Sequence, residues 1–231
     1  RLARLAKILS RFLNSWLIKG DFHMQTLGAP FKTWADGAVT PLAEEIPELR
    51  RLNETDLEDR EGRRMILQDP DYARSFKSMW MNGKHGWTLS RLKRKFNLED
   101  YAFHRTLADM QLERCPQTSW QGMDFQEIFE RVNAINSGEY PPDTNENELE
   151  IAHVEFAWIE DEGDFMLQML RSFDNDLTWS TTTANRDLGV VRELLMDPLL
   201  LPGFNDSGAH LTNMAFYDVN LRSLKLASQG G

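Results

Sequence analysis

Apolar residues recur at helical spacing over residues 2–16. They are Leu2, Leu5, Ile8, Leu9, Phe12, Leu13 and Trp16. Basic residues, among them Lys7 and Arg11, take the opposite face, and the pattern predicts an amphipathic helix that ends at Gly20. Such a helix either lies on a membrane surface or packs as an outer helix on a sheet. We favour packing, because the helix leads straight into a strand-like segment.

Two short segments resemble strands. Residues 21–27 form the first, and Gly28, Ala29 and Pro30 follow it. The second is the apolar run at residues 199–204, which comes after a helix that stops before Asp197. A short apolar run is typical of a buried parallel strand, and Pro202 predicts that this one is short. A helix that leads into a short strand ending in a polar loop is typical of an α/β barrel.

The middle of the chain is more polar and mostly helical in pattern. Residues 30–47 contain three prolines and are expected to form a long irregular loop. Residues 48–99 are charged with helical spacing, whereas residues 101–114 alternate like one strand of a hairpin. A helix is expected over roughly 150–172, although Gly163 leaves two shorter elements open.

One helix start in this middle region has a specific local signal. Asp124, with Glu127 three positions later, resembles a capping box that opens a helix through Val132. Residues 136–149 are rich in Gly, Pro, Asn, Asp and Glu and are expected to form a solvated loop. The predicted division is 1–47 (helix, strand and loop), 48–150 (largely helical insertion with a hairpin) and 151–231 (helices and the last strand).

Composition excludes several classes of function. The chain has 41% hydrophobic and 27% charged residues, which are ordinary values for a globular protein. The formal net charge of −10 disfavours binding to nucleic acid, because a phosphate backbone would be repelled. Cys115 is the single cysteine and cannot form an internal disulfide, so a reducing, cytoplasmic location is expected. No apolar run is long enough to span a bilayer, so no membrane partner is expected.

The candidate chemistry follows the last predicted strand, where the sequence becomes polar from Asn205 to His210. Asp206 and His210 lie four positions apart on a turn that Gly208 makes adaptable. In an α/β barrel, catalytic residues follow the carboxyl ends of strands. An aspartate there can bind a metal or accept a proton from water, and a histidine can donate to a developing oxyanion. The alternative is an ordinary Asp-Ser-Gly turn without a catalytic role.

Residues 201–210, which read Leu-Pro-Gly-Phe-Asn-Asp-Ser-Gly-Ala-His, resemble a known motif. The motif follows the eighth strand in the D-aminoacylase and N-acyl-D-amino-acid deacylase branch of the amidohydrolase superfamily. Further similarity extends over most of the chain. It includes residues 34–42 with Glu44 and Glu45, Asp69-Pro70, Cys115-Pro116 before Gly122, and Asn185 ahead of Asp197-Pro198.

This resemblance implies a metal-dependent hydrolase of carbon–nitrogen (amide) bonds, built on a TIM barrel. The chain would supply the last strands and helices of the barrel, a partial TIM barrel with a mostly helical insertion. The metal, usually zinc in this family, polarises the scissile carbonyl and activates water. Asp206 matches the aspartate that binds the metal and relays a proton to the leaving amine, and His210 matches a histidine that contacts the substrate. The expected partner is a small-molecule amide.

Three further residues near the predicted site are candidates for substrate contact. His23 and Gln25 belong to the predicted seventh strand, and Lys32 begins the loop after it. For His23, ordinary packing is the favoured alternative. For Lys32, the default interpretation is a solvated loop residue.

The chain departs from the family pattern at the main metal ligands. The family has an His-x-His pair at the first strand and single histidines on the fifth and sixth strands, and this sequence contains no His-x-His. Its five histidines are His23, His85, His104, His153 and His210. The main zinc ligands are therefore expected outside this chain, since a catalytic zinc takes about three protein ligands. We predict that the chain alone is inactive and that its exposed sheet edge favours oligomers. The alternative is a non-catalytic interaction or scaffold protein whose helical middle binds a partner.

Overall fold

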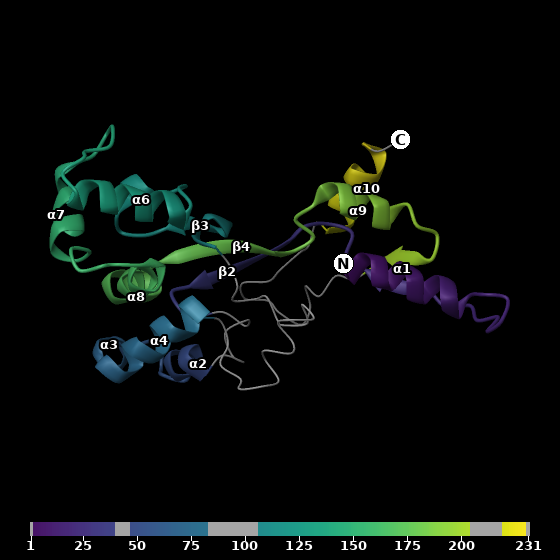
Figure 1. Ribbon diagram of the computed structural model, residues 1–231, viewed down its shortest axis with the longest axis horizontal. Helices are drawn as coiled ribbons and strands as arrows, with labels where there is room; N and C mark the ends of the chain where they lie inside the picture. The colour runs from purple at the N-terminus through teal and green to yellow at the C-terminus, as the bar shows by residue number, and fades with distance from the viewer. Residues whose placement is uncertain (1, 40–46, 83–105, 204–218, 230–231) are drawn as a thin grey trace. The chain divides into compact units, whose positions relative to one another are not determined.

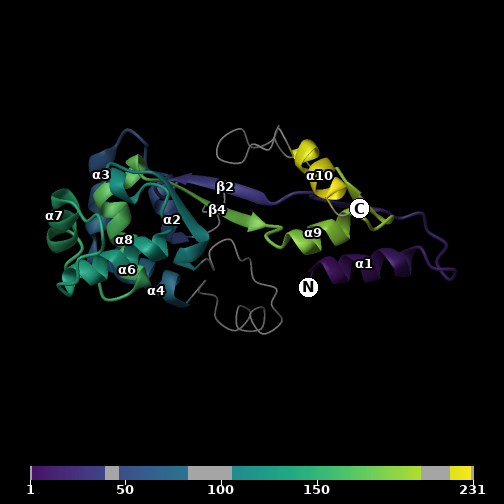
Figure 2. The same ribbon diagram turned by 90° about the horizontal axis from the view of Figure 1, so that it is seen from above.

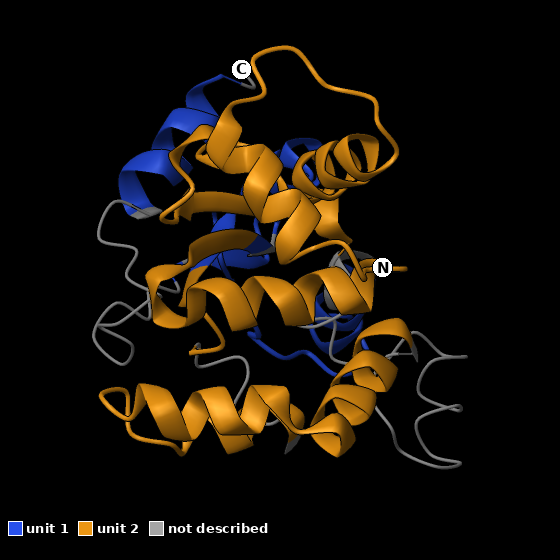
Figure 3. Cartoon of the chain, turned by 90° about the vertical axis from the view of Figure 1, so that its left-hand side faces the viewer, with its two compact units in different colours: residues 1–33, 182–231 blue, residues 34–181 orange. Residues whose placement is uncertain are grey.

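The computed structural model describes residues 2–39, 47–82, 106–203 and 219–229, which form a mixed α/β protein (Figure 1). The chain divides into two compact units, coloured in Figure 3. Unit 1 comprises residues 1–33 and 182–231, and unit 2 comprises residues 34–181. None of the helices in these described ranges combines the length and apolar character needed to cross a bilayer.

Unit 1 is built on two parallel strands from opposite ends of the sequence. Strand β1 (Met24–Thr26) pairs with β5 (Leu200–Pro202), and Met24 lies opposite Leu200. The two strands lie within the segments that were predicted as strands from the sequence. The helices of this unit are α1 (Leu2–Leu13), α9 (Leu188–Leu195) and α10 (Val219–Ser228).

Helix α1 packs through the face opposite to the one that was predicted. It lies beside α9 through its polar side, where Lys7 Nζ is 2.6 Å from Glu193 Oε1 and Ser10 is fully buried (Figure 2). Its apolar side is exposed instead: Ile8 is 64% and Phe12 55% accessible. The expectation that this apolar side packs on a sheet was therefore wrong for the described residues. The helix also ends at Leu13, before the predicted Gly20.

Unit 2 contains most of the helices. These are α2 (Pro47–Asn53), α3 (Arg60–Gln68), α4 (Pro70–Asn82), α6 (Phe125–Asn136), α7 (Glu146–Val154) and α8 (Glu162–Phe173). Short 3-10 turns are η2 (Leu107–Asp109), η3 (Thr118–Trp120) and η4 (Asp174–Asp176). The capping box of α6 is confirmed: Asp124 Oδ1 accepts from the Glu127 N–H and Glu127 Oε2 from the Asp124 N–H, both at 2.9 Å.

Helix α8 supplies the centre of the unit 2 core. Every residue from Phe165 to Leu170 is buried, so the helix is covered on all sides. Phe165 meets Phe125 edge-on at 6.3 Å between ring centroids, and Trp120 meets Phe156 edge-on at 5.8 Å. The shorter-element alternative for residues 150–172 is confirmed, because α7 ends at Val154 and α8 starts at Glu162.

The second sheet has the order β2-β4-β3, with β2 at Phe31–Asp36, β3 at Met110–Arg114 and β4 at Thr178–Ala184. β3 is antiparallel to β4, and Leu112 lies opposite Trp179. The expected loop over 30–47 was wrong for residues 31–36, which form a strand with Thr33 and Ala35 buried at alternating positions. The expected strand over 101–114 is shorter, because residues 107–109 form a 3-10 turn; residues 101–105 lie outside the described ranges.

The two units do not follow the divisions at residues 47 and 150. The boundaries fall after residues 33 and 181, within β2 and β4. The physical reason lies in the helices after residue 150. α7 packs against α6, and α8 packs against α3 and α4, so these helices complete the core of unit 2.

Candidate functional site

The candidate site is the carboxyl-terminal edge of the β1–β5 pair. The register is parallel and unbroken, ending with Thr26 opposite Pro202. The Gly203 N–H continues the ladder by donating to the Thr26 carbonyl oxygen at 3.3 Å. Parallel strands end at the same edge of a sheet, so the segments that follow Thr26 and Gly203 leave from neighbouring positions.

The start of β5 is fixed by the turn at Asp197, a buried carboxylate. Asp197 Oδ1 accepts from the Leu199 N–H at 3.1 Å, and the Leu200 N–H donates to the Asp197 carbonyl oxygen at 3.0 Å. Arg11 Nη2 lies 3.3 Å from Asp197 Oδ2. This turn sets where β5 begins and therefore where its carboxyl end falls.

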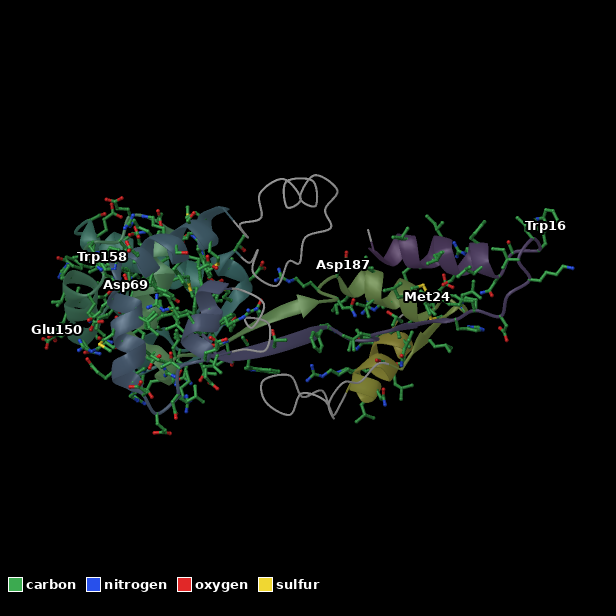
Figure 4. All side chains as sticks on the ribbon, turned by 90° about the horizontal axis from the view of Figure 1, so that it is seen from below. Trp16, Met24, Asp69, Glu150, Trp158 and Asp187 are labelled. Carbon is green, nitrogen blue, oxygen red and sulfur yellow. The ribbon has the colours of Figure 1, made fainter. Side chains whose placement is uncertain are left out.

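The segment after β1 is held by the side chain of Asn185. Its Nδ2 donates to the carbonyl oxygen of Leu27 at 2.6 Å and to that of Ala29 at 3.1 Å. Asn185 has a φ of 59°, a left-handed conformation that asparagine tolerates better than most residues. Two residues later, Asp187 caps α9 by accepting from the Gly189 and Val190 N–H groups (Figure 4). The end of β4 and the loop after β1 are thus tied together.

Close packing leaves no room for a side chain at Gly28, whereas a Cβ at Gly203 would require only a small shift of the Gln25 side chain. A Cβ on Gly28 would lie 2.4 Å from Ser223 Oγ of α10, which is closer than real contacts allow. A Cβ on Gly203 would lie 3.3 Å from Gln25 Nε2, so the Gln25 amide lies against the start of the segment that carries Asp206. Gln25 is itself exposed to solvent.

The structure locates His23, Gln25 and Lys32 among the predicted site residues. Asp206 and His210 lie outside the described residues. His23 precedes β1, so it lies at the amino end of that strand and not at the carboxyl edge where we expected it. Its Nε2 is 3.2 Å from Asp21 Oδ1, and its side chain is 36% exposed. Lys32 is half-buried on strand β2, which corrects its assignment to a loop.

Sequence reasoning missed the roles of Asn185 and Ser223. Asn185 was singled out only as part of the resemblance. Its left-handed backbone and its bonds to residues more than 150 positions away leave no local signal. Ser223 is buried against Gly28, and a serine on a helix gives no indication of such packing.

The described residues do not form a metal site by themselves. Among them, no group of three or more His, Cys, Asp or Glu side chains is placed to hold a metal ion.

Unit 2 has an open polar cavity of about 340 Å³. Its wall includes Gln117, Asn147, Glu150, Glu155 and Ser172. Several of these polar groups already bind one another: Asn147 Nδ2 donates to Gln117 Oε1, and Ser172 Oγ donates to a Glu155 carboxylate oxygen. These bonds occupy part of the hydrogen-bonding capacity of the wall.

Sequence comparison links the chain to longer mycobacterial proteins. It is 28% identical over 218 residues to an uncharacterized protein of Mycobacterium bovis, and equally to uncharacterized proteins of two Mycobacterium tuberculosis strains. The alignment covers 94% of this chain but 29% of each relative, so the chain spans less than a third of their length. No family model matches the sequence, and no solved structure matches.

Proposed function

We propose that the chain is the C-terminal part of a metal-dependent amidohydrolase of the N-acyl-D-amino-acid deacylase type. Its β1 and β5 would be the seventh and eighth strands of a TIM barrel, and unit 2 would be an insertion between them. The substrate class is a small molecule with an acyl–nitrogen bond, and the expected location is cytoplasmic.

The observation that carries the proposal is the parallel register of β1 and β5. Met24 and Leu200 are paired although the whole of unit 2 lies between them in the sequence. Consecutive barrel strands are parallel neighbours, and insertions occur in the loops that follow them at the carboxyl end. The segment with Asp206 leaves β5 at that end, which is where such barrels hold their catalytic residues.

In the proposed reaction, Asp206 transfers the proton. Its carboxylate would accept a proton from the attacking water and return it to the nitrogen of the leaving amine. His210 would contact the substrate oxygen that becomes negatively charged. Zinc, when bound, would act as the Lewis acid on the scissile carbonyl. Because the sequence contains no His-x-His pair, the other zinc ligands would come from another part of a longer polypeptide.

The decisive experiment uses the complete reading frame that contains this chain. Zinc content and hydrolysis of N-acetyl-D-amino acids are measured for the wild type, for Asp206→Asn and for the surface control Asp71→Asn. The side chain of Asp71 is 81% exposed and pairs only locally with Arg74. We expect Asp206→Asn to lower kcat/KM by about 100-fold or more, and Asp71→Asn to leave it unchanged. Equal activity of the wild type and Asp206→Asn would contradict the proposal.

A second test uses the 231-residue chain by itself. We expect no amide hydrolysis with added zinc, because Asp206 alone cannot supply the roughly three protein ligands of a catalytic site. Measurable turnover that depends on zinc would show that this chain holds a complete site, against the proposed division of ligands.

The second candidate is a non-catalytic interaction protein. It is favoured by one observation: unit 2 has a hydrophobic core of its own, built around Phe125, Phe165 and Trp120. A separate globular insertion can serve as a binding module. An upstream His-x-His in the complete reading frame, with bound zinc, favours the enzyme; a start codon close to Arg1 favours the interaction protein.

A further inference from the structure

Helix α1 and the turn after it display a row of large apolar side chains to solvent. On the helix, Leu5 is 59%, Ile8 64%, Leu9 42% and Phe12 55% accessible. Trp16 is 83% and Leu17 67% accessible, and Figure 4 shows the Trp16 ring extending outward from the chain. Residues at spacings of three and four lie on one side of a helix, so the helical members form one continuous apolar face. Patches of this kind mark interaction surfaces.

The opposite side of α1 is polar, and it is the side that packs on the protein. Ser10 is fully buried with no hydrogen-bond partner for its Oγ. The Lys7 side chain, which is 11% exposed, lies on the same side and pairs with Glu193. Burying a hydroxyl without a partner costs about 1–3 kcal/mol, whereas burying Ile8 and Phe12 would be favourable. The apolar face of α1 is therefore suited to a surface that lies away from α9.

The charges around α1 favour a protein surface over a lipid surface. A helix that binds anionic lipid directs its basic residues toward the headgroups. Here Lys7 pairs with Glu193 on α9, and Arg11 pairs with Asp197 in the turn that follows α9.

The strands of unit 1 supply the argument for which protein surface this is. In the described residues, β1 and β5 make a sheet of two strands. Parallel sheets are normally larger and covered by helices on both faces, and a two-stranded sheet is only marginally stable. The relatives match 94% of this chain with 29% of their own length, so they have ample further sequence to complete such a sheet.

We propose that the apolar face of α1 (Leu5, Ile8, Leu9 and Phe12) is an intramolecular interface, covered in the complete polypeptide by a strand–helix unit of its remaining sequence. The inference rests on the proposed function only in requiring a longer α/β chain. It assigns the surface through which these 231 residues contact the rest of that chain.

Cysteine labelling tests this directly, because the native Cys115 is buried and gives a low background. Ile8→Cys is made in the 231-residue chain and in the complete protein, with Met65→Cys on α3 as the matched control. Met65 is 61% accessible, close to the value for Ile8. Labelling rates with a fluorescent maleimide are compared at low protein concentration, and circular dichroism confirms that each variant is folded.

We expect the thiol of the Ile8→Cys variant to react quickly in the 231-residue chain and about tenfold or more slowly in the complete protein, as for a group that is exposed only on local opening. The thiol of the Met65→Cys control should react equally fast in both proteins. Equal rates for the Ile8→Cys variant in the two proteins would overturn the proposal.

Two further outcomes would also overturn it. Protection of the Ile8→Cys thiol in the 231-residue chain that grows with protein concentration would indicate a second copy as the occupant. Protection that needs phosphatidylserine vesicles would indicate a lipid surface. No outcome depends on amide hydrolysis, so this proposal and the proposed activity can fail separately.

Discussion

The side-chain amide of Asn185 donates a hydrogen bond of 2.6 Å to the backbone carbonyl oxygen of Leu27, 158 residues earlier in the chain. This bond and its companion to Ala29 hold the segment that leaves the carboxyl end of β1. The backbone of Asn185 has a positive φ of 59°. Both its side chain and its backbone conformation therefore contribute to this attachment, called the Asn185 clamp below.

The Asn185 clamp can be separated into these two contributions by substitution. Asn185→Gly removes the hydrogen bonds and keeps the left-handed backbone accessible, whereas Asn185→Ala removes the bonds and adds a cost of roughly 1–2 kcal/mol for the conformation. We expect both variants to have a lower free energy of unfolding than the wild type, and Asn185→Ala to have the lower value of the two. Amide hydrogen exchange at Gly28 and Ala29 should quicken in both. Unchanged exchange at these amides in Asn185→Gly would show that other contacts hold the segment.

A buried ion pair joins α3 to the turn after α8. Arg63 is 1% exposed, the Asp174 side chain is 25% exposed, and Arg63 Nη2 lies 2.6 Å from Asp174 Oδ2. We expect Asp174→Asn to destabilise unit 2 by about 3 kcal/mol, because it leaves a buried guanidinium without its counter-charge. Arg63→Met removes that charge and fills the space, so it should cost less. Urea unfolding measures both free energies.

The adjacent pair Arg60–Asp176 supplies the control for this prediction. It has a similar length of 2.9 Å, but its side chains are 64% and 50% exposed. Solvent screens exposed pairs, so Asp176→Asn should change stability much less than Asp174→Asn. If the two asparagine variants were equally unstable, burial would not be the cause of the difference that we predict.

Local signals explain how much of the fold follows from the sequence. The capping box at Asp124 and Glu127 and the strand-like segments of β1 and β5 are each contained within a few residues, and each was predicted. Strand β2 was missed because prolines flank its region and its partner β4 lies far along the chain. The Asn185 clamp and the seating of α1 likewise depend on distant residues, so no window of sequence contains their cause.

Acid should weaken the contact between α4 and α8. Burial by itself would raise the pKa of Asp161, but hydrogen bonds from Lys77 and from the Asp164 N–H outweigh it, and the pKa lies below the ordinary value of 3.8. Hydrogen bonds to the carboxylates of Asp164 and Asp161 hold the pKa of Lys77 well above its usual range, so Lys77 stays charged throughout. A depressed carboxylate pKa stabilises the fold above pH 3.8 and loses its effect as pH falls through the folded-state value.

Urea titrations at pH 6, 4 and 3 measure this loss. Lys77→Met removes the partner that lowers the pKa of Asp161, so Asp161 contributes less to the loss of stability in acid. The free energy of unfolding of this variant should therefore fall less steeply with decreasing pH than that of the wild type. Arg74→Met, which removes an exposed pair on the same helix, should keep the wild-type slope. Parallel slopes for Lys77→Met and the wild type would contradict the prediction.

Cys115 should be chemically inert in the folded protein. Burial raises the pKa of its thiol to about 11, although the hydrogen bond with the Gln117 backbone acts in the opposite direction. At pH 8 the reactive thiolate is therefore scarce as well as inaccessible. We expect no alkylation by iodoacetamide in buffer and rapid alkylation in 6 M guanidinium chloride. Fast alkylation in buffer would mean that the region around Gln117 opens readily.

Unit 2 should fold on its own. The main core cluster runs from Ala35 to Trp179 and lies entirely within it, while the separate small cluster at Ala29 belongs to unit 1. A fragment from Phe31 to Ala184 keeps β2 and β4 whole. Because it retains that core, we expect cooperative thermal unfolding by circular dichroism and dispersed amide resonances. Trp120→Ala removes a fully buried ring and should destabilise the fragment by about 3–5 kcal/mol. A fragment that unfolds without a cooperative transition would show that the core needs residues of unit 1.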